Sequence, residues 1–261
     1  MFLMAEGDLP IILVSHMDTV FAVPPHTFYY DQEQTVLWSP EGLGADDRAG
    51  VYAIIELIER GFRPSIILTQ YEERGGVGAD ALVEIHKQCP FKNCKAIIQL
   101  DRRGYDDSVY YDCDNAQFEE TINCYGFKTA LGTFSDISII APVWGIAAVN
   151  LSCGYTNEHF PTETLNLTWL NSTIEKVANM LKDCDTWSDY AYIPKPYIPV
   201  MGNWWTQDHC VCCGKELKRN EGYYCNATAN SEKDFKVCED CYAAYFPNDC
   251  PDDNLYPTEE D

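Results

Sequence analysis

The chain has 261 residues, with 41 Asp and Glu against 18 Lys and Arg, so its formal net charge is −23. Phosphate backbones repel a chain this acidic, and we expect no nucleic-acid partner. A hydrophobic content of 46% excludes a disordered chain, and no apolar run reaches the roughly 18 to 20 residues of a membrane helix, so we expect no membrane partner.

The N-terminus reaches an acidic residue, Glu6, before any basic or signal-like apolar segment forms. We therefore expect a cytoplasmic protein. Short apolar runs then alternate with stretches of helical periodicity, which predicts the α/β class with a mixed, mostly parallel sheet and helices on both faces. We predict strands at residues 11–14, 35–38, 65–70, 96–100 and 146–151, helices at 49–59, 79–87, 134–140 and 167–181, and two antiparallel edge strands within 105–125.

The composition changes near residue 186 and predicts four regions. Residues 1–186 form the α/β core. Residues 187–206, rich in proline and aromatic side chains, form a connector that lies against the core, because its aromatics would otherwise be exposed. Residues 207–246 form a cysteine-rich module, and residues 247–261 form an acidic tail that we expect to be disordered.

Ionisable side chains follow several of the predicted apolar strands directly. In an open α/β sheet, sites form in the crevice beyond the carboxyl ends of the strands. One such residue alone is typical of a turn or a helix cap, but a set of acids and imidazoles at one rim can bind divalent metals. The candidates are His16, Asp18, Asp46, Asp47, Glu72, Glu73, Asp101 and His159.

Two cations about 3.5 to 4 Å apart need a shared ligand that offsets their repulsion, and a carboxylate can bridge them. In the pair Glu72 and Glu73, one acid can bind metal while the other takes a proton. Asp18, two residues beyond His16, can hold the imidazole in one tautomer. A water held between two metals loses a proton near neutral pH and becomes a nucleophile.

Four motifs carry a resemblance to a known superfamily: Ser-His-Met-Asp-Thr-Val at 15–20, Gly-Ala-Asp-Asp-Arg-Ala-Gly at 44–50, Glu-Glu-Arg-Gly-Gly-Val-Gly at 72–78 and Asn-Glu-His at 157–159. Together with Asp101, they resemble the di-zinc exopeptidases of the M20 and M28 metallopeptidases. That superfamily contains aminopeptidases, dipeptidases, carboxypeptidases and deacylases. The resemblance extends over about residues 10–182.

The resemblance implies a role for each matching residue. His16, Asp46 and Asp101 would bind one metal, and Asp46 would bridge to a second metal completed by Glu73 and His159. Glu72 would be the general base that activates the bridging water and protonates the leaving amine. Asp18 would orient His16. Asp47 would shape the site or cap the following helix.

The chain departs from the superfamily pattern in two places. Only 57 residues separate Asp101 from His159, too few for the lid domain that many M20 members insert there, so we expect a lidless core close to M28 organisation. Only 15 residues precede His16, and we expect an open sheet edge filled by the connector or by a partner chain. Ser135 lies in a segment that resembles a substrate-side loop, although a helix N-cap explains it equally.

The C-terminal region carries two Cys-x₂-Cys pairs separated by 24 residues. Four thiolates in this pattern are typical of a structural zinc site, as in a zinc ribbon or treble-clef finger, and zinc would supply most of the folding energy of so small a module. The predicted ligands are Cys210, Cys213, Cys238 and Cys241, with His209, Cys212 and Cys225 as possible substitutes. We expect the module to stabilise the chain or to contact a protein partner or a second copy.

We therefore expect a metal-dependent hydrolase with two catalytic divalent metals, zinc by resemblance, and one structural zinc. Its substrate would be a peptide, cleaved near a chain end by an aminopeptidase or dipeptidase reaction through a water that bridges the metals. A deacylase of N-acyl amino acids is the alternative on the same fold. A non-catalytic binding protein that recruits a partner through the zinc module is the alternative of another class.

Overall fold

The computed structural model describes residues 1–195, 210, 215–217, 223–226 and 234–240. The chain forms two compact units, Met1–Pro196 and Tyr197–Asp261. None of the described helices is long and apolar enough to cross a membrane. The domain bounds expected from composition stay predictions. The first unit continues through the first half of the expected connector.

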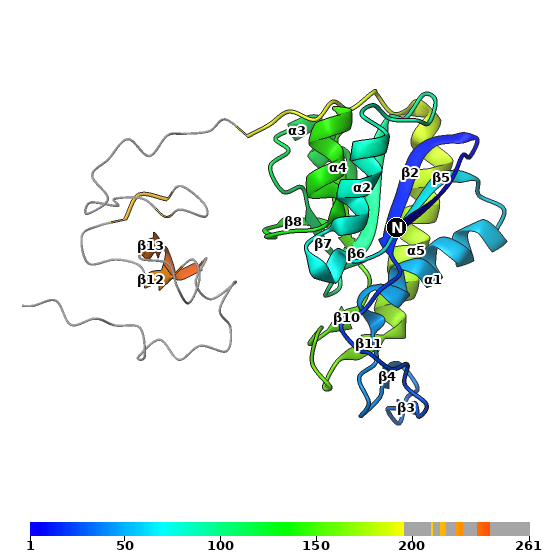
Figure 1. Ribbon diagram of the computed structural model, residues 1–261, viewed down its shortest axis with the longest axis vertical. Helices are drawn as coiled ribbons and strands as arrows, with labels where there is room; N and C mark the ends of the chain where they lie inside the picture. Colours follow the sequence, from blue (N-terminus) through cyan, green and yellow to red (C-terminus); the bar gives the residue numbers. More distant parts are fainter. Residues whose placement is uncertain (196–209, 211–214, 218–222, 227–233, 241–261) are drawn as a thin grey trace, which may run out of the picture. The chain divides into compact units, whose positions relative to one another are not determined.

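A seven-stranded sheet forms the centre of the first unit (Figure 1). Its four inner strands β5, β2, β6 and β9 are parallel, and β1 and β7 pair antiparallel with the outer two. In spatial order the strands are β1 (Phe2–Ala5), β5 (Pro64–Thr69), β2 (Leu9–His16), β6 (Ala96–Arg102), β9 (Ala148–Ser152), β7 (Asp107–Val109) and β8 (Lys128–Ala130). The predicted mixed, mostly parallel sheet is confirmed.

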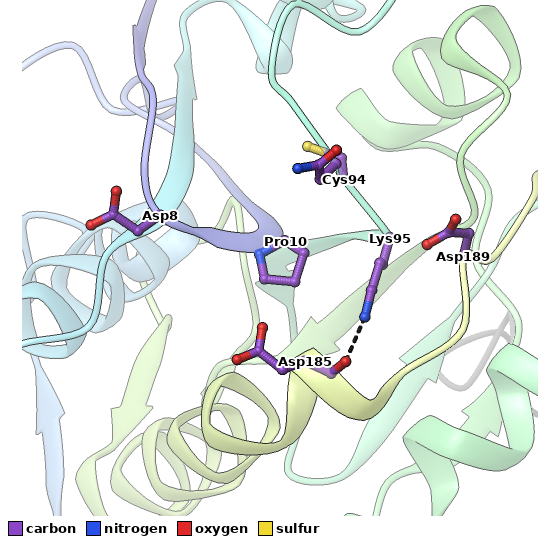
Figure 2. Close-up of a pocket in the computed structure, with 7 residues that line it drawn as sticks. Asp8, Pro10, Cys94, Lys95, Asp185 and Asp189 are labelled. Carbon is purple, nitrogen blue, oxygen red and sulfur yellow. Dashed lines mark hydrogen bonds between the residues drawn. The ribbon is translucent and has the colours of Figure 1, made fainter.

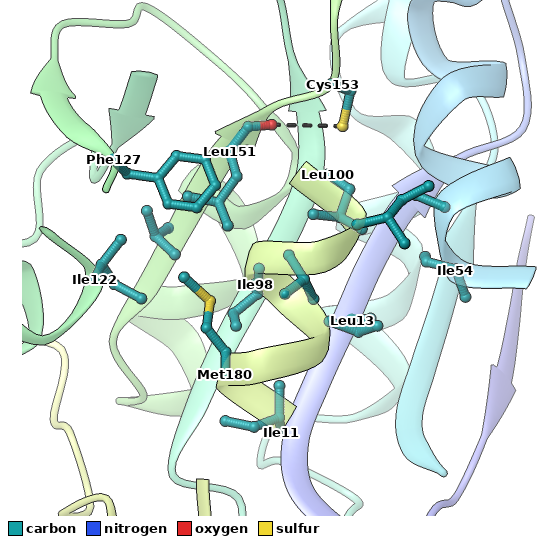
Figure 3. Packing of buried hydrophobic residues seen from close by; sticks show 14 of the residues in the cluster. Ile11, Leu13, Ile54, Ile98, Leu100, Ile122, Phe127, Leu151, Cys153 and Met180 are labelled. Carbon is teal, nitrogen blue, oxygen red and sulfur yellow. Dashed lines mark hydrogen bonds between the residues drawn. The ribbon is translucent and has the colours of Figure 1, made fainter. Parts of the chain in front are cut away.

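Helices cover both faces of this sheet, because side chains alternate along each inner strand. In β2, Ile11 and Leu13 enter one hydrophobic cluster, whereas Ile12 and Val14 enter the other. The first cluster also contains side chains of α1 (Ala45–Glu59), α3 (Ala116–Asn123) and α5 (Leu167–Asp183), and Figure 3 shows its packing. The second contains side chains of α2 (Val77–Ile85) and α4 (Asp136–Trp144).

A small antiparallel sheet lies beyond the carboxyl ends of the parallel strands, below the large sheet in Figure 1. Its strand order is β10 (Tyr155–Thr156), β11 (Thr164–Asn166), β4 (Val36–Trp38) and β3 (Tyr29–Tyr30). The loop between β10 and β11 contains His159. The small sheet thus holds a loop distant in sequence near the ends of the central strands.

The segment 105–125 differs from its prediction of two antiparallel strands. β7 pairs parallel with β8, and α3 lies between these two strands. The prediction was wrong in its second half because Phe118 and Ile122, spaced one helical turn apart, form a buried helix face. Asn115 caps this helix by accepting a hydrogen bond from Phe118 N at 3.1 Å.

The sheet edge also differs from its prediction. The N-terminal strand β1 forms this edge by pairing with β5, and none of the described connector residues, 187–195, pairs with it. The connector's first residues lie instead at the amino ends of the central strands, where Tyr190 N donates to Lys95 O at 3.0 Å and Ala147 N donates to Tyr190 O at 2.9 Å. Trp187 and Tyr190 are buried there against the core, and residues 196–206 of the connector lie outside the described residues.

The second unit contains an antiparallel pair, β12 (Tyr223–Asn226) and β13 (Asp234–Val237). Cys210 and Cys238 are buried, and Cys210 N donates to Lys215 O at 2.8 Å. Cys213 and Cys241 lie outside the described residues, as do His209, Cys212 and the acidic tail. The four-cysteine site therefore stays a prediction.

Candidate active site

Six ionisable side chains meet at the carboxyl ends of the parallel strands; we call them the carboxylate–histidine cluster. His16 is the last residue of β2, and Asp101 lies near the end of β6. Glu72 and Glu73 occupy a short 3₁₀ turn, η1 (Glu72–Arg74), that follows β5. Asp46 lies in the first turn of α1, and His159 lies in the β10–β11 loop. The cluster consists of His16, Asp46, Glu72, Glu73, Asp101 and His159.

Asp46 lies at the centre of the cluster. Its Oδ1 is 3.1 Å from Nε2 of His16, and its Oδ2 is 3.1 Å from Nε2 of His159. On the first side, Nε2 of His16 is also 3.4 Å from Oδ1 of Asp101. On the second side, Nε2 of His159 is 3.0 Å from Oε2 of Glu73. The two oxygens of the Asp46 carboxylate thus face two separate groups of ligand atoms. One group contains His16 and Asp101, and the other contains Glu73 and His159.

Asp18 joins His16 to the turn that carries the two glutamates. Nδ1 of His16 donates to the backbone oxygen of Asp18 at 3.0 Å, which leaves the lone pair of Nε2 for the cluster. The Asp18 carboxylate lies 3.5 Å from Nδ1 of His16 and accepts hydrogen bonds from the backbone N–H groups of Tyr71 at 2.7 Å and Glu72 at 3.3 Å. Asp18 therefore fixes the ring tautomer and the position of Glu72 together.

Glu72 also belongs to the cluster, but its carboxylate lies farther from the imidazole nitrogens than the other three carboxylates do. Its Oε2 is 4.0 Å from Nε2 of His16. Burial, followed by the negative charge of Asp101, raises the pKa of Glu72 to about 8. A carboxyl group with this pKa can both accept and release a proton near neutral pH.

Asp101 is held by side chains from three directions. Its Oδ1 accepts from the Tyr155 hydroxyl at 3.2 Å, and its Oδ2 accepts from Gln99 Nε2 at 3.0 Å and from the Ser135 hydroxyl at 3.3 Å. Ser135 precedes α4, but its side chain makes no capping hydrogen bond. Ser135 is thus the N-cap residue of α4 by position, as expected, but its hydroxyl donates to Asp101 instead of accepting from the helix backbone.

Asp47, joined to Asp46 by a cis peptide bond, lies beside the cluster with its oxygens already engaged. Its Oδ2 accepts from the Ser15 hydroxyl and from His16 N, the latter at 3.1 Å, and its Oδ1 accepts from Gly50 N at 3.1 Å. His16, Asp47 and Asp101 are close enough to hold an ion. We favour Asp46 as the ligand, because the Asp47 oxygens already accept these three hydrogen bonds.

Glu163 is a residue that the sequence did not single out. Its side chain is fully buried, and its two carboxylate oxygens accept hydrogen bonds from Ala45 N at 3.1 Å and Asp46 N at 3.0 Å. It lies four residues after His159, at the end of the same loop. Glu163 thus ties the loop of one histidine to the backbone of the central aspartate. A Glu at this spacing has no special sequence signature.

The charges of the cluster strongly shift the pKa values of its own side chains. Burial lowers the pKa of His16, but the carboxylates of Asp101, Asp18 and Asp46 together outweigh this effect, so the net shift is upward. Hydrogen bonds with Asp46 and then Glu73 raise the pKa of His159 to about 10. Burial alone would raise the pKa of Asp46, yet its bonds to His159 and His16 hold that pKa below the usual range. The carboxylates therefore favour a positive charge in their midst.

The donor set fits a pair of divalent cations. Imidazole nitrogens and carboxylate oxygens suit zinc and its neighbours. His16, Asp46 and Glu73 offer ligand atoms close enough to hold one ion, and Oε1 of Glu73 is buried with no hydrogen-bond partner among the described residues. A buried carboxylate oxygen without a partner is unfavourable unless a cation or a water satisfies it.

The amino-terminal half of the chain is similar to a known family. Residues 3–131 match Peptidase family M28. This match includes His16, Asp46, Glu72, Glu73 and Asp101 and ends before His159. A comparison with curated protein sequences finds no match.

Solved structures show the same fold. The aminopeptidase PepT from Bacillus cereus matches with a TM-score of 0.54 and 18% identity over 70% of this chain and 84% of that chain. A tripeptidase from Staphylococcus aureus matches with a TM-score of 0.56 and 15% identity, over 71% and 84%. The TET1 peptidase from Pyrococcus horikoshii matches with a TM-score of 0.50 and 15% identity, over 69% and 86%.

Proposed function

Because residues 3–131 match Peptidase family M28, we propose that the carboxylate–histidine cluster of this chain binds two divalent cations and hydrolyses a peptide bond next to a chain end. Of the two ends of a peptide substrate, we propose that the enzyme recognises the amino end. Zinc is the proposed metal, because both donor groups combine imidazole with carboxylate. The match is to M28 rather than to M20, in agreement with a core that lacks room for a lid domain.

One observation carries the proposal: the carboxylate of Asp46 faces His16 with one oxygen and His159 with the other, each at 3.1 Å. His16, Asp46 and Asp101 would hold the first cation, and Asp46, Glu73 and His159 the second. A single carboxylate shared in this way offsets the repulsion between two cations.

The residues of the chain then divide the work. Bound cations would polarise the scissile carbonyl and lower the pKa of the attacking water. Glu72 takes a proton from that water and delivers it to the departing amine, a transfer for which a pKa of about 8 is suited. Asp18 keeps His16 in one tautomer and holds the backbone of Glu72 in position. Glu163 holds the backbone of Asp46.

The variant Glu72→Gln tests this division. We expect both cluster metals to stay bound, because Glu72 is not a proposed ligand, and peptide hydrolysis to fall by about 10²-fold or more through loss of proton transfer. The measurements are elemental analysis of the dialysed protein and turnover of di- and tripeptides with a free amino end. Unchanged turnover would contradict the mechanism.

Two matched variants make this result specific. Glu73→Gln changes the adjacent acid, a proposed ligand, and should lose one metal together with activity. Glu175→Gln changes an acid on α5 that pairs with Arg60 far along the chain, and should keep both metals and full turnover. If Glu72→Gln and Glu73→Gln lose metal equally, the assignment of base and ligand is wrong.

The same fold could instead remove an acyl group from an N-acyl amino acid. Matched substrates separate the two reactions: a tripeptide with a free amino end, the same peptide acetylated, and the corresponding N-acetyl amino acid. We expect turnover of the free peptide. Turnover of the N-acetyl amino acid alone would favour a deacylase, and turnover of none would favour the non-catalytic binding protein.

The second unit has a proposed structural role. We propose that Cys210, Cys213, Cys238 and Cys241 bind one zinc and that this unit contacts a protein partner or a second copy. The buried positions of Cys210 and Cys238 support it. The Pyrococcus horikoshii TET1 peptidase can assemble into a tetrahedron or a large octahedral shell, and self-association of this chain is a proposal by analogy. A cytoplasmic location likewise stays a proposal.

A further inference from the structure

The 3₁₀ turn η1 carries a third charged side chain, Arg74, directly after the two glutamates of the cluster. The carboxylates of Glu72 and Glu73 turn toward the imidazoles of the cluster. In a 3₁₀ turn, side chains three positions apart lie on the same side. Arg74 accordingly lies beside Tyr71 rather than beside the imidazoles, and both Arg74 and Tyr71 are exposed.

The Tyr71 ring orients the guanidinium of Arg74. Arg74 Cζ lies over this ring, 5.2 Å from its centroid. A guanidinium that lies over an aromatic ring keeps the N–H groups in its own plane available as donors. The backbone beneath the ring is fixed as well, because Tyr71 N donates to the Asp18 carboxylate at 2.7 Å. The cation is thus held at the rim of the cluster with its donors directed outward from the ring.

The Arg74 guanidinium forms no hydrogen bond or ion pair with any residue that the structure describes. The other arginines within two positions of a cluster residue are engaged: Arg48 donates to Leu43 O at 3.2 Å, Arg102 to Asp107 at 3.3 Å and Arg103 to Glu158 at 2.7 Å. A planar guanidinium matches the two oxygens of a carboxylate. Arg74 therefore offers a carboxylate-binding group beside the proposed catalytic base.

We propose that Arg74, oriented by Tyr71, binds a carboxylate on the leaving part of the peptide substrate. This subsite rests on the proposed function, in which Glu72 protonates the departing amine, so the leaving part must begin beside Glu72. Consecutive Cα atoms are about 3.8 Å apart, which puts the backbones of Arg74 and Glu72 within about 8 Å of each other. An extended residue spans at most about 3.6 Å, so a carboxylate one or two residues beyond the scissile bond lies within the same range. The subsite therefore favours dipeptides and tripeptides.

The cavity in Figure 2 does not offer the same chemistry. It has a volume of about 390 Å³, lies at the amino ends of the parallel strands, and has Lys95 and the aspartates Asp8, Asp185 and Asp189 in its lining. The Lys95 ammonium group already donates to the backbone oxygens of Cys184 at 3.2 Å and Asp185 at 2.7 Å. The aspartates repel a substrate carboxylate. The cluster lies at the opposite ends of these strands.

Three matched peptides test the subsite in the unsubstituted, metal-loaded chain. They are Leu-Gly-Gly, its carboxyl-terminal amide, and Leu-Gly-Asp amide, in which the only carboxylate is on a side chain. We expect kcat/KM to be at least about 10-fold higher for Leu-Gly-Gly than for its amide, through KM rather than kcat, because the amide offers no anion. The third peptide distinguishes a terminal carboxylate from a side-chain one, and a preference for either over the plain amide supports the subsite. Equal kcat/KM for all three peptides would overturn it.

Two variants assign the preference to the stacked pair. In Arg74→Gln, the ratio of kcat/KM for the preferred peptide to kcat/KM for the plain amide should fall at least about 10-fold, because no cation remains to bind the carboxylate. Tyr71→Leu removes the ring and should lower the same ratio by a smaller factor, since the guanidinium keeps its charge but loses its orientation. A purely structural role of either side chain would slow both peptides equally and leave the ratio unchanged.

A matched arginine serves as the control. Arg60 is partly exposed and pairs with Glu56 and Glu175, so Arg60→Gln should keep the full ratio. A ratio that persists in Arg74→Gln, or that falls in Arg103→Gln instead, would show that Arg74 does not bind the carboxylate.

Calorimetry separates failure of the subsite from failure of the proposed function. The Glu72→Gln chain should bind peptides without cleaving them, and adding Arg74→Gln to it should raise the Kd of Leu-Gly-Gly at least about 10-fold. If no peptide is cleaved but this difference in Kd is found, the hydrolase proposal fails and the carboxylate site stands. If peptides are cleaved but neither KM nor Kd depends on Arg74, the subsite alone fails.

Discussion

At the scale of single residues, the cluster depends on acids that are not themselves proposed ligands. Asp18, Asp47 and Glu163 accept backbone N–H groups of His16, Asp46 or the Glu72 turn. These contacts fix where the ligand atoms lie before any cation arrives. Preorganised ligands bind metal more tightly than free ones, because less ordering remains to be done on binding.

Glu163→Gln tests this positioning role. A glutamine amide offers one oxygen, and its NH₂ group would face a backbone N–H, so the segment of Asp46 should lose one anchor. We expect metal affinity to fall by about 10- to 100-fold and activity to recover in excess metal. Titration of activity against free zinc measures this. Glu41→Gln is the control, because Glu41 also accepts a backbone N–H, from His26 at 2.6 Å, but is exposed. A loss of activity that excess metal does not restore would contradict the positioning role of Glu163.

Asp136 should make the stability of the protein depend on pH. It is fully buried, its Oδ2 accepts from the Thr69 hydroxyl, and its Oδ1 has no hydrogen-bond partner in the described part of the chain. Burial raises its pKa to about 6; His16 opposes the rise, and Asp101 and Asp18 add to it. The folded state therefore binds more protons than the unfolded state between pH 4 and 6, and stability falls as pH rises through that window.

Asp136→Asn should remove this dependence. Across pH 4 to 6, the unfolding free energy of the unsubstituted chain should fall relative to the variant by on the order of 2–3 kcal/mol. Urea unfolding at each pH measures it. Asp80→Asn is the control, an exposed acid in the first turn of α2. Parallel curves for Asp136→Asn and the unsubstituted chain would contradict the assignment.

At the scale of secondary-structure elements, α1 lies unusually close to β6 beneath the cluster. A Cβ atom on Gly50 would come within 1.8 Å of the Leu100 backbone oxygen and 2.5 Å of an Asp47 carboxylate oxygen. Only glycine allows the helix to approach the strand this closely, and the approach brings Asp46 and Asp101 to the same edge. The glycine is required by space, not by its backbone angles.

Gly50→Ala should therefore disturb fold and site together. We expect a loss of at least roughly 1–3 kcal/mol of unfolding free energy, because backbone and carboxylate must both move, and a loss of activity in the protein that remains folded. Ile55→Ala is the control on the exposed face of the same helix and should change stability by about 0.5 kcal/mol or less. Urea unfolding and peptide turnover measure both. Equal stability of the two variants would show that the helix can shift freely.

The sequence predicted the central strands and most helices because their patterns are local. A continuous apolar run marks β2, and helical spacing marks α1 and α5. The antiparallel strand β1 was missed, because four residues at a terminus carry too little pattern. α3 was missed because its exposed face is polar, so its two buried side chains alone reveal it.

The candidate site was predictable only in part. The ligand types came from motifs, and their order matched a known superfamily. Their convergence depends on contacts between distant segments, such as Glu163 with Asp46 across 117 positions. No local pattern encodes such contacts, so the supporting residues Glu163 and Tyr155 were found only from the fold.

At the scale of the whole molecule, the two units should bind metal independently. We expect about three metals per chain, two removable by a chelator and one retained by thiolates. Cys238→Ser should lose one metal and keep peptide turnover, whereas Glu73→Gln should lose a cluster metal and keep the thiolate-bound one. Elemental analysis before and after chelation measures this. A single metal per chain, lost in Cys238→Ser, would contradict the hydrolase proposal.

The order of the ligands along the chain has a consequence for synthesis. His16 leaves the ribosome before the other proposed ligands, whereas His159 and Glu163 emerge only after the last strand of the large sheet, β9, has been made. In a growing chain, the Asp46 carboxylate therefore lacks its contact with His159 until most of the first unit has been made. Peptidase activity would then appear late in synthesis, when the nascent polypeptide can already bury its own cleavable ends.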